Sequence, residues 1–278
     1  MTPDWENAHG ARTGVLLVGH GTRSEPGRRQ CRALADEIAA GLDERVFAAE
    51  LAYLEMASPT IDEGVARLLA QQVERLIVVP LLLFAAGHAK EDIPAAVRSA
   101  LATAGLPNLP IVHAEPIGLQ EAVIELAAIR FHETADDSIR PEQTCLLLIG
   151  RGSRDAEATA DLRQLGELLH QRLGIGQTQV GFLAMAQPSA PDIIQAAATS
   201  NFPQIVVQPH LLFHGELLDR LEQSIRAAAA QTPGKTWRRG RVLGEGTCQL
   251  AHILVQGILT AGNNQNGPSS KLLTNQAW

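Results

Sequence analysis

The sequence has little cysteine and no excess of positive charge, and each absence excludes a class of protein. Its three cysteines, Cys31, Cys145 and Cys248, lie far apart and form no Cys-X-X-Cys pair. This usage argues against an iron–sulfur cluster or a zinc knuckle and favours a reducing compartment. The formal net charge of −7 argues against nucleic acid as a partner.

The sequence also lacks long apolar runs. None approaches the roughly 20 residues that a membrane-spanning helix needs. Residues 1–12 are polar and include Asp4 and Glu6, so they lack the basic and apolar regions of a signal peptide. We therefore expect a cytoplasmic protein with no membrane partner. The 278 residues, 45% of them hydrophobic, suffice for one large domain or two ordinary ones.

Strand and helix patterns alternate along the chain, which favours an α/β fold. Short apolar runs, typical of parallel strands buried on both faces, are each followed by apolar residues at a helical period. The first four strands are expected within residues 15–19, 45–55, 76–84 and 110–116, and the helices over 27–42, 61–72, 93–101 and 119–132.

Three ionisable side chains follow these strands. His20 lies between Gly19 and Gly21, which allow a sharp turn and a close approach to the imidazole. Glu55 lies just past the second strand, and His88 follows the third. Because ligands of open parallel sheets bind at the carboxyl ends of the strands, we expect all three in one crevice. Taken alone, His20 fits an ordinary strand-to-helix turn equally well.

The same pattern recurs in the second part of the chain. Three segments reappear in the same order about 130 residues later: 15–23 as 145–154, 53–59 as 182–188, and 76–84 as 205–213. Such a match indicates an internal duplication.

The duplication predicts two tandem domains, over residues 13–135 and 144–261, related by a pseudo-twofold axis. Each should be a mainly parallel sheet flanked by helices. The polar segment 133–143 is the best candidate for a linker. Residues 262–278 are rich in Asn, Gln, Ser and Gly, which predicts a disordered tail.

The two repeats differ in the polar residues at the strand exits. His20 is replaced by Arg151, Glu55 by Ala184, and His88 by Leu217, whereas the glycines, prolines and apolar strand residues persist. A residue that one repeat lacks is not needed for folding. We therefore expect a single functional site, in the first repeat.

Two imidazoles and a carboxylate fit an open site for a divalent transition metal. The same groups can accept protons near pH 7. From the residues alone, the site fits metal transfer, metal-assisted hydrolysis or proton transfer.

These motifs resemble a known family. Gly-His-Gly-Thr-Arg at 19–23, Tyr-Leu-Glu at 53–55 with Pro59, and the segment 80–94 around His88 resemble the class II sirohydrochlorin chelatases. These enzymes insert cobalt or iron in the cobalamin and sirohaem pathways. The second repeat resembles the C-terminal half of the family's long, two-domain form. The resemblance covers roughly residues 13 to 260.

The resemblance implies roles for the three strand-exit residues. His20 and His88 would be the metal-binding and catalytic histidines, and Glu55 the metal-binding carboxylate. The metal would be a substrate, with no permanently bound cofactor. Some long members add a histidine-rich segment or a cysteine cluster, and this chain has neither. The choice between Fe²⁺ and Co²⁺ therefore stays open.

Sirohydrochlorin carries many carboxylates, so an acidic protein must concentrate positive charge around it. The candidates are loop residues that should face the cleft: Arg23, Lys90, Arg151 and Arg154. Solvated surface charge is the alternative for these four. Asp92 would either orient His88 or start the following helix.

Two further histidines, His210 and His214, belong to the second repeat. His210 lies within a strand and is expected to be a core residue with satisfied hydrogen bonds, whereas His214 lies near a strand exit and is a candidate for substrate contact. A first rival function is a carrier of metal or tetrapyrrole, which would share the binding site without turnover. The second rival is a histidine phosphatase, but those enzymes place an arginine immediately before the histidine, where this chain has Gly19. This difference argues against a phosphatase.

A monomer is expected, because the fused repeats supply a cleft that a half-length relative builds by dimerising.

Overall fold

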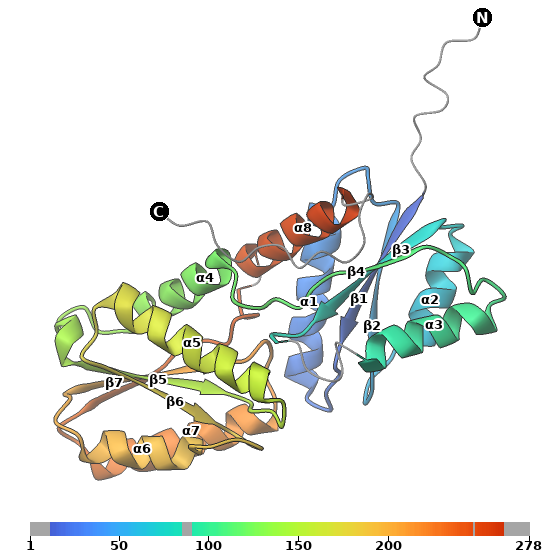
Figure 1. Ribbon diagram of the computed structural model, residues 1–278. Coiled ribbons are helices and arrows are strands. Elements are labelled where there is room, and N and C mark those ends of the chain that lie inside the picture. Colours follow the sequence, from blue (N-terminus) through green and yellow to red (C-terminus); the bar gives the residue numbers. More distant parts are fainter. Residues whose placement is uncertain (1–11, 85–90, 247, 264–278) are drawn as a thin grey trace, which may run out of the picture.

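The computed structural model describes residues 12–84, 91–246 and 248–263. These residues form two four-stranded parallel sheets flanked by helices (Figure 1), so the expected α/β class is confirmed. The first sheet has the order β2-β1-β3-β4 and the second the order β6-β5-β7-β8. The two repeats therefore share one topology.

The first repeat contains β1 (Thr13–Gly19), α1 (Glu25–Gly41), β2 (Ala48–Tyr53), α2 (Ile61–Ala70), β3 (Arg75–Leu81), α3 (Ile93–Thr103), β4 (Ile111–His113) and α4 (Glu121–His132). A 3-10 turn over Pro141–Gln143 precedes the second repeat. This repeat contains β5 (Thr144–Gly150), α5 (Ala156–Leu173), β6 (Gln177–Phe182), α6 (Ala190–Thr199), β7 (Gln204–His210), α7 (Glu216–Gln231), β8 (Thr236–Arg239) and α8 (Cys248–Asn263).

Local signals set where the elements begin and end. Helix α1 begins two residues before the expected start, because the Ser24 side chain accepts a hydrogen bond from the Gly27 amide and caps the helix. Strand β3 ends at Leu81, three residues earlier than expected. Its partner β1 ends at Gly19, opposite Leu81, so the ladder offers no further pairing.

Both faces of each sheet are covered by helices, as the apolar strands require. All seven residues of β1 are buried. Val15 and Leu17 pack in the cluster formed with α1 and α8, whereas Leu16 and Val18 pack against α2 and α3. In the second sheet, α4 and α5 cover one face and α6 and α7 the other.

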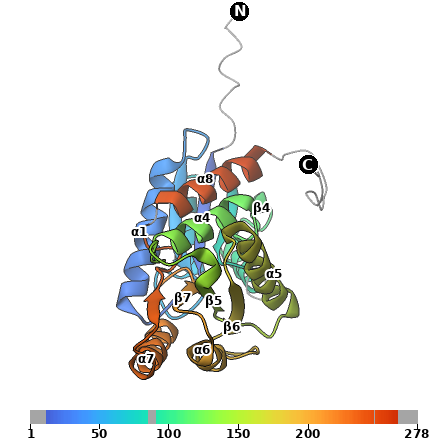
Figure 2. The same ribbon diagram turned by 90° about the vertical axis from the view of Figure 1, so that its left-hand side faces the viewer.

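The last helix of each repeat packs on the sheet of the other repeat. Helix α4 belongs to the first repeat, yet its Ala127 and Phe131 lie in one apolar cluster with Leu146 of β5. Helix α8 belongs to the second repeat, yet Leu250 and Leu254 pack with α1 and the first sheet. The two helices lie side by side in both views (Figures 1 and 2). Each sheet therefore depends on both repeats for its cover.

The C-terminal helix extends further than the repeat pattern indicates. Helix α8 reaches Asn263, so Gly262 and Asn263 are helical rather than part of a tail. Residues 264–278, the remainder of the expected tail, lie outside the described residues. Within the described chain, no helix is both long enough and apolar enough to cross a membrane.

Candidate active site

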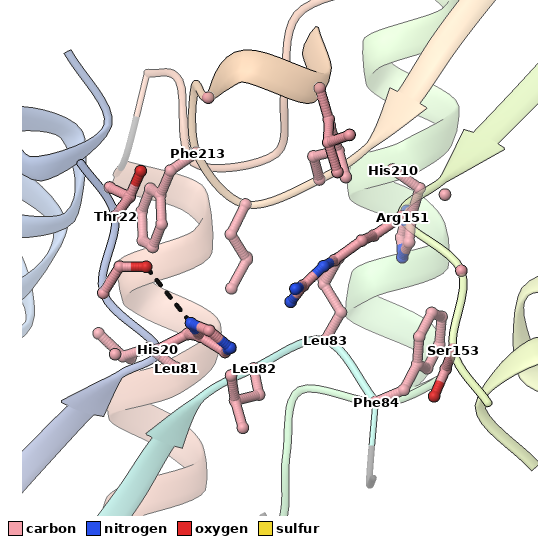
Figure 3. Close-up of a pocket in the computed structure, with 18 of the residues that line it drawn as sticks. His20, Thr22, Leu81, Leu82, Leu83, Phe84, Arg151, Ser153, His210 and Phe213 are labelled. Carbon is pink, nitrogen blue, oxygen red and sulfur yellow. Dashed lines mark hydrogen bonds between the residues drawn. The ribbon is translucent and has the colours of Figure 1, made fainter. Parts of the chain in front are cut away.

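A cavity of about 820 Å³ lies where the carboxyl ends of the two sheets meet (Figure 3). Its wall includes the exits of the central strands β1, β3, β5 and β7. In a sheet of this order the chain turns to opposite sides after β1 and β3, which leaves a crevice between their ends. The volume is that of an ordinary small-molecule site.

The first repeat places His20 and Glu55 next to each other through its backbone. The Leu54 amide donates to the Gly19 carbonyl, and the Glu55 amide donates to the His20 carbonyl. Gly21 adopts φ +97°, and a Cβ atom there would lie 1.7 Å from the Glu55 carbonyl oxygen. Only glycine allows the strand exits to approach this closely.

The two side chains form a half-exposed pair. Nε2 of His20 lies 3.5 Å from Oε1 of Glu55, and their side chains are 16% and 51% exposed. Nδ1 of His20 lies 3.4 Å from the Gly21 carbonyl oxygen, which is an acceptor (Figure 3). A proton on Nδ1 would leave the Nε2 lone pair facing the carboxylate, an arrangement that suits a cation or a proton between them.

Two site residues predicted from the sequence, His88 and Lys90, lie outside the described residues. Among the residues that the structure describes, no cluster of three or more His, Cys, Asp or Glu side chains could hold a metal ion. Asp92 lies at the cavity and occupies the N-cap position of α3, where its side chain makes no capping hydrogen bond.

Arginines from both repeats line the cavity. Arg23 follows His20 on the first wall, and Arg151 and Arg154 lie on the second. Figure 3 shows Arg151 pointing into the space between the walls, toward His20. All three residues are exposed, so their guanidinium groups can meet an anion without a large desolvation penalty.

The second repeat builds the same turn without the ligands. Gly152 has φ +87°, and a Cβ atom there would lie 1.8 Å from the carbonyl oxygen of Ala184. Arg151 stands where the first repeat has His20, and Ala184 where it has Glu55. The turn therefore forms without the imidazole and the carboxylate, whose presence in the first repeat is not explained by folding.

Two methionines occupy equivalent positions in these turns. Met56 and Met185 have φ of 58° and 59°, a left-handed conformation that is unusual for a side chain of this kind. Both line the cavity, and they are 49% and 53% exposed. Neither position was singled out in the sequence, where a methionine after a strand carries no signal.

His210 corrects the expectation of a satisfied core histidine. It is buried, as expected, but neither ring nitrogen has a hydrogen-bond partner among the described residues. Burial lowers the pKa of His210 to about 4, so the ring is neutral at pH 7. Its ring lies 5.5 Å from that of Phe84, centroid to centroid, and it lines the cavity.

His214 also lines the cavity and links the two repeats. Its Nδ1 lies 3.4 Å from the Ser24 hydroxyl, and its Nε2 lies 3.3 Å from a carboxylate oxygen of Asp219. Its backbone amide donates to the Gln30 side chain at 2.7 Å. These contacts give His214 a role in joining the walls of the cavity.

Cys31 is a further cavity residue, and its chemistry is limited by burial. Burial raises the pKa of the Cys31 thiol to about 11, although a hydrogen bond with Tyr53 opposes the shift. The thiol is therefore protonated at pH 7 and is a poor nucleophile.

Comparison with known proteins identifies the family. A sequence model of the CbiX family matches residues 14–134 and 145–261, so it covers both repeats. The chain belongs to the CbiX family.

Relatives in this family are named as chelatases. The chain is 32% identical over 256 residues to a sirohydrochlorin ferrochelatase from Priestia megaterium, covering 90% of this chain and 92% of that one. It is 28% identical over 213 residues to a sirohydrochlorin cobaltochelatase from the same organism, covering 76% and 68% of the two chains.

A solved structure shares the whole fold. SirB from Bacillus subtilis with Fe³⁺ superposes with a TM-score of 0.80 at 25% identity, covering 91% of this chain and 96% of that one. The two-sheet architecture is therefore shared over most of both chains.

Proposed function

We propose that this protein is a sirohydrochlorin chelatase, a lyase that inserts Fe²⁺ or Co²⁺ into sirohydrochlorin with release of two protons. The observation that carries the proposal is the His20–Glu55 pair, 3.5 Å apart at one wall of a cavity of about 820 Å³. Membership of the CbiX family and the relatives named as sirohydrochlorin chelatases support it.

The reaction makes three demands on the protein. Water must leave the ion, two pyrrole N–H protons must be removed, and the macrocycle must be held against the ion. A neutral imidazole suits both divalent ions, and a carboxylate offsets part of their charge. We assign His20 as the principal metal ligand and proton acceptor, with Glu55 beside it. His88 is the expected second imidazole.

The positively charged side chains of the cavity bind the carboxylates of the tetrapyrrole. Arg23, Arg151 and Arg154 come from both walls, so they can hold carboxylates on opposite edges of one macrocycle. Lys90 is the expected fourth cation and Asp92 the expected partner of His88. Arg151 therefore binds substrate at the position of the second repeat that is equivalent to the metal ligand His20 of the first.

We further infer a monomer that acts in the cytoplasm. The two repeats supply both walls of the cavity, so no second copy is needed to complete it. Cys31, Cys145 and Cys248 are free thiols, as in a reducing compartment.

Anaerobic insertion assays test the function. Sirohydrochlorin is mixed with Fe²⁺ or Co²⁺, and metal insertion is followed by absorbance with and without the protein. The wild type should accelerate insertion of at least one ion, and His20→Ala should abolish the acceleration while still binding metal-free sirohydrochlorin.

The same assay separates an enzyme from a carrier. A wild type that binds tetrapyrrole without accelerating insertion of either ion would contradict the proposal and favour a carrier. Arg226→Ala is a suitable control, because Arg226 is a highly exposed residue of α7 outside the cavity wall and should leave the rate unchanged.

A further inference from the structure

His210 is a buried polar side chain for which the described chain supplies no partner. It is 1% exposed, and both ring nitrogens lack a hydrogen bond among the described residues. A polar group buried in this way destabilises the folded state. Native proteins retain few such groups, so this imidazole calls for a partner that is not part of the described chain.

The position of His210 connects it to the active-site cavity. It is the last residue of β7 and is paired in register with Gly150, the residue before Arg151. Both His210 and Arg151 line the cavity. Figure 3 shows His210 on the wall opposite His20, with Arg151 reaching into the space between them.

The first repeat shows what the fold itself requires at this point. Leu81 ends β3 and is paired with Gly19, as His210 ends β7 and is paired with Gly150. Leu81 is also 1% exposed. An apolar side chain is therefore sufficient for packing, and a histidine at the equivalent position of the second repeat is not explained by it.

We propose that His210 and Arg151 form a subsite for one side-chain carboxylate of the tetrapyrrole, which turns the macrocycle toward His20 and Glu55. This inference rests on the proposed function. The imidazole donates an N–H to one carboxylate oxygen, and the guanidinium donates to the carboxylate and neutralises its charge. The Phe84 ring lies beside the imidazole, with the two ring planes tilted by 32°.

The repeat provides a matched pair of variants. His210→Leu introduces the residue that the first repeat carries at this position. Gln208→Val does the same two residues earlier, where the first repeat has Val79. Gln208 is also buried and polar, and its Oε1 lacks a hydrogen bond among the described residues. Its Nε2, however, donates to the Ala127 carbonyl of α4, and the residue does not line the cavity.

The measurement is equilibrium binding of metal-free sirohydrochlorin, followed by absorbance under anaerobic conditions. Loss of a hydrogen bond to a charged group should weaken binding by about ten- to a hundredfold in His210→Leu. Gln208→Val should bind like the wild type. The melting temperature of free His210→Leu should equal or exceed that of the wild type, because an unsatisfied polar group is removed.

A double substitution tests whether the two residues hold the same carboxylate. If they do, His210→Leu with Arg151→Gln should lose less affinity than the product of the two single losses. Independent losses would overturn the shared subsite.

Three further results would each overturn the proposal: unchanged binding in His210→Leu, an equal loss of affinity in Gln208→Val, or failure of His210→Leu to fold. If the wild type binds no sirohydrochlorin and inserts no metal, the proposed function itself fails. If the wild type does both and His210→Leu binds normally, only the subsite fails.

Discussion

Nε2 of His20 lies 3.5 Å from Oε1 of Glu55, although 35 positions separate the two residues in the sequence. Two parallel strands end side by side, and backbone hydrogen bonds between their exits hold the pair together. The second repeat has the same exits with arginine and alanine in these places, so the pair can be removed without dismantling the turn.

Glu55→Ala should therefore lose activity but not stability. Ala184 occupies the equivalent position of the second repeat, and we expect the unfolding free energy to change by less than about 1 kcal/mol. Metal insertion should fall by about 100-fold or more, because the charge beside His20 is lost. Steady-state kinetics and thermal unfolding measure the two effects. Glu50→Ala, in β2 and paired with Arg67, is the control and should keep the wild-type rate.

Gly21→Ala should be among the most damaging substitutions. Its Cβ atom would lie 1.7 Å from a carbonyl oxygen at φ +97°, so the strand exits must separate. We expect a loss of more than about 3 kcal/mol in unfolding free energy. Gly152→Ala should behave alike, since its contact is 1.8 Å.

Gly105→Ala is the control for backbone strain alone. Gly105 has φ +76°, and a Cβ atom there would meet nothing within 4 Å. Gly105→Ala should lower the unfolding free energy by about 1 kcal/mol. Denaturant unfolding of the three variants ranks them, and a Gly21→Ala protein as stable as Gly105→Ala would contradict the close approach.

The stability of the wild type should depend on pH through His210. Burial lowers the pKa of His210 to about 4, against an ordinary value of 6.5. Between these values the unfolded chain binds more protons, so the folded state loses stability as pH falls from 6.5 to 4. Acidification from pH 7 to 4 should destabilise the wild type by about 3 kcal/mol more than His210→Leu. Parallel pH profiles of unfolding free energy for the two proteins would refute this assignment.

Met56 and Met185 should matter for substrate more than for the fold. Their exposed side chains flank the cavity from equivalent turns, and their backbone is already in the left-handed region. Met56→Asn suits that conformation, so stability should change by less than about 1 kcal/mol. The KM for sirohydrochlorin should rise several-fold with the loss of apolar contact. Leu106→Ser, an exposed apolar residue after α3, is the control and should leave KM unchanged.

Because each sheet is covered by a helix of the other repeat, a destabilising substitution in one repeat should also destabilise the other. Leu250 of α8 is fully buried in the cluster that includes α1 and the first sheet. Leu250→Ala should lower the unfolding free energy by about 2 to 5 kcal/mol. Hydrogen exchange should show faster exchange in α1 and β3, which belong to the first repeat. Faster hydrogen exchange confined to the second repeat would contradict the packing of α8 on the first repeat.

Much of the fold and part of the site follow from local sequence pattern. Short apolar runs followed by helical periods identify parallel α/β units, and the duplication shows that there are two. The carboxyl ends of parallel strands share an edge, which is why His20 and Glu55 could be expected together. The two glycines that flank His20 in the sequence likewise indicate a tight turn there.

Other features depend on packing between distant segments, and only the tertiary structure decided them. The apolar face of α4 or α8 shows that each helix is buried, but the pattern is the same whichever sheet it covers. The hydrogen bonding of His210 depends on what the neighbouring elements supply, and a strand pattern contains no such information. By itself the sequence determined the strand–helix units and which of them carry ionisable residues, because those depend on neighbours along the chain. The tertiary structure decided how the two units exchange helices and face each other across one cavity, because those contacts form between elements of different repeats, which the local pattern does not relate to each other.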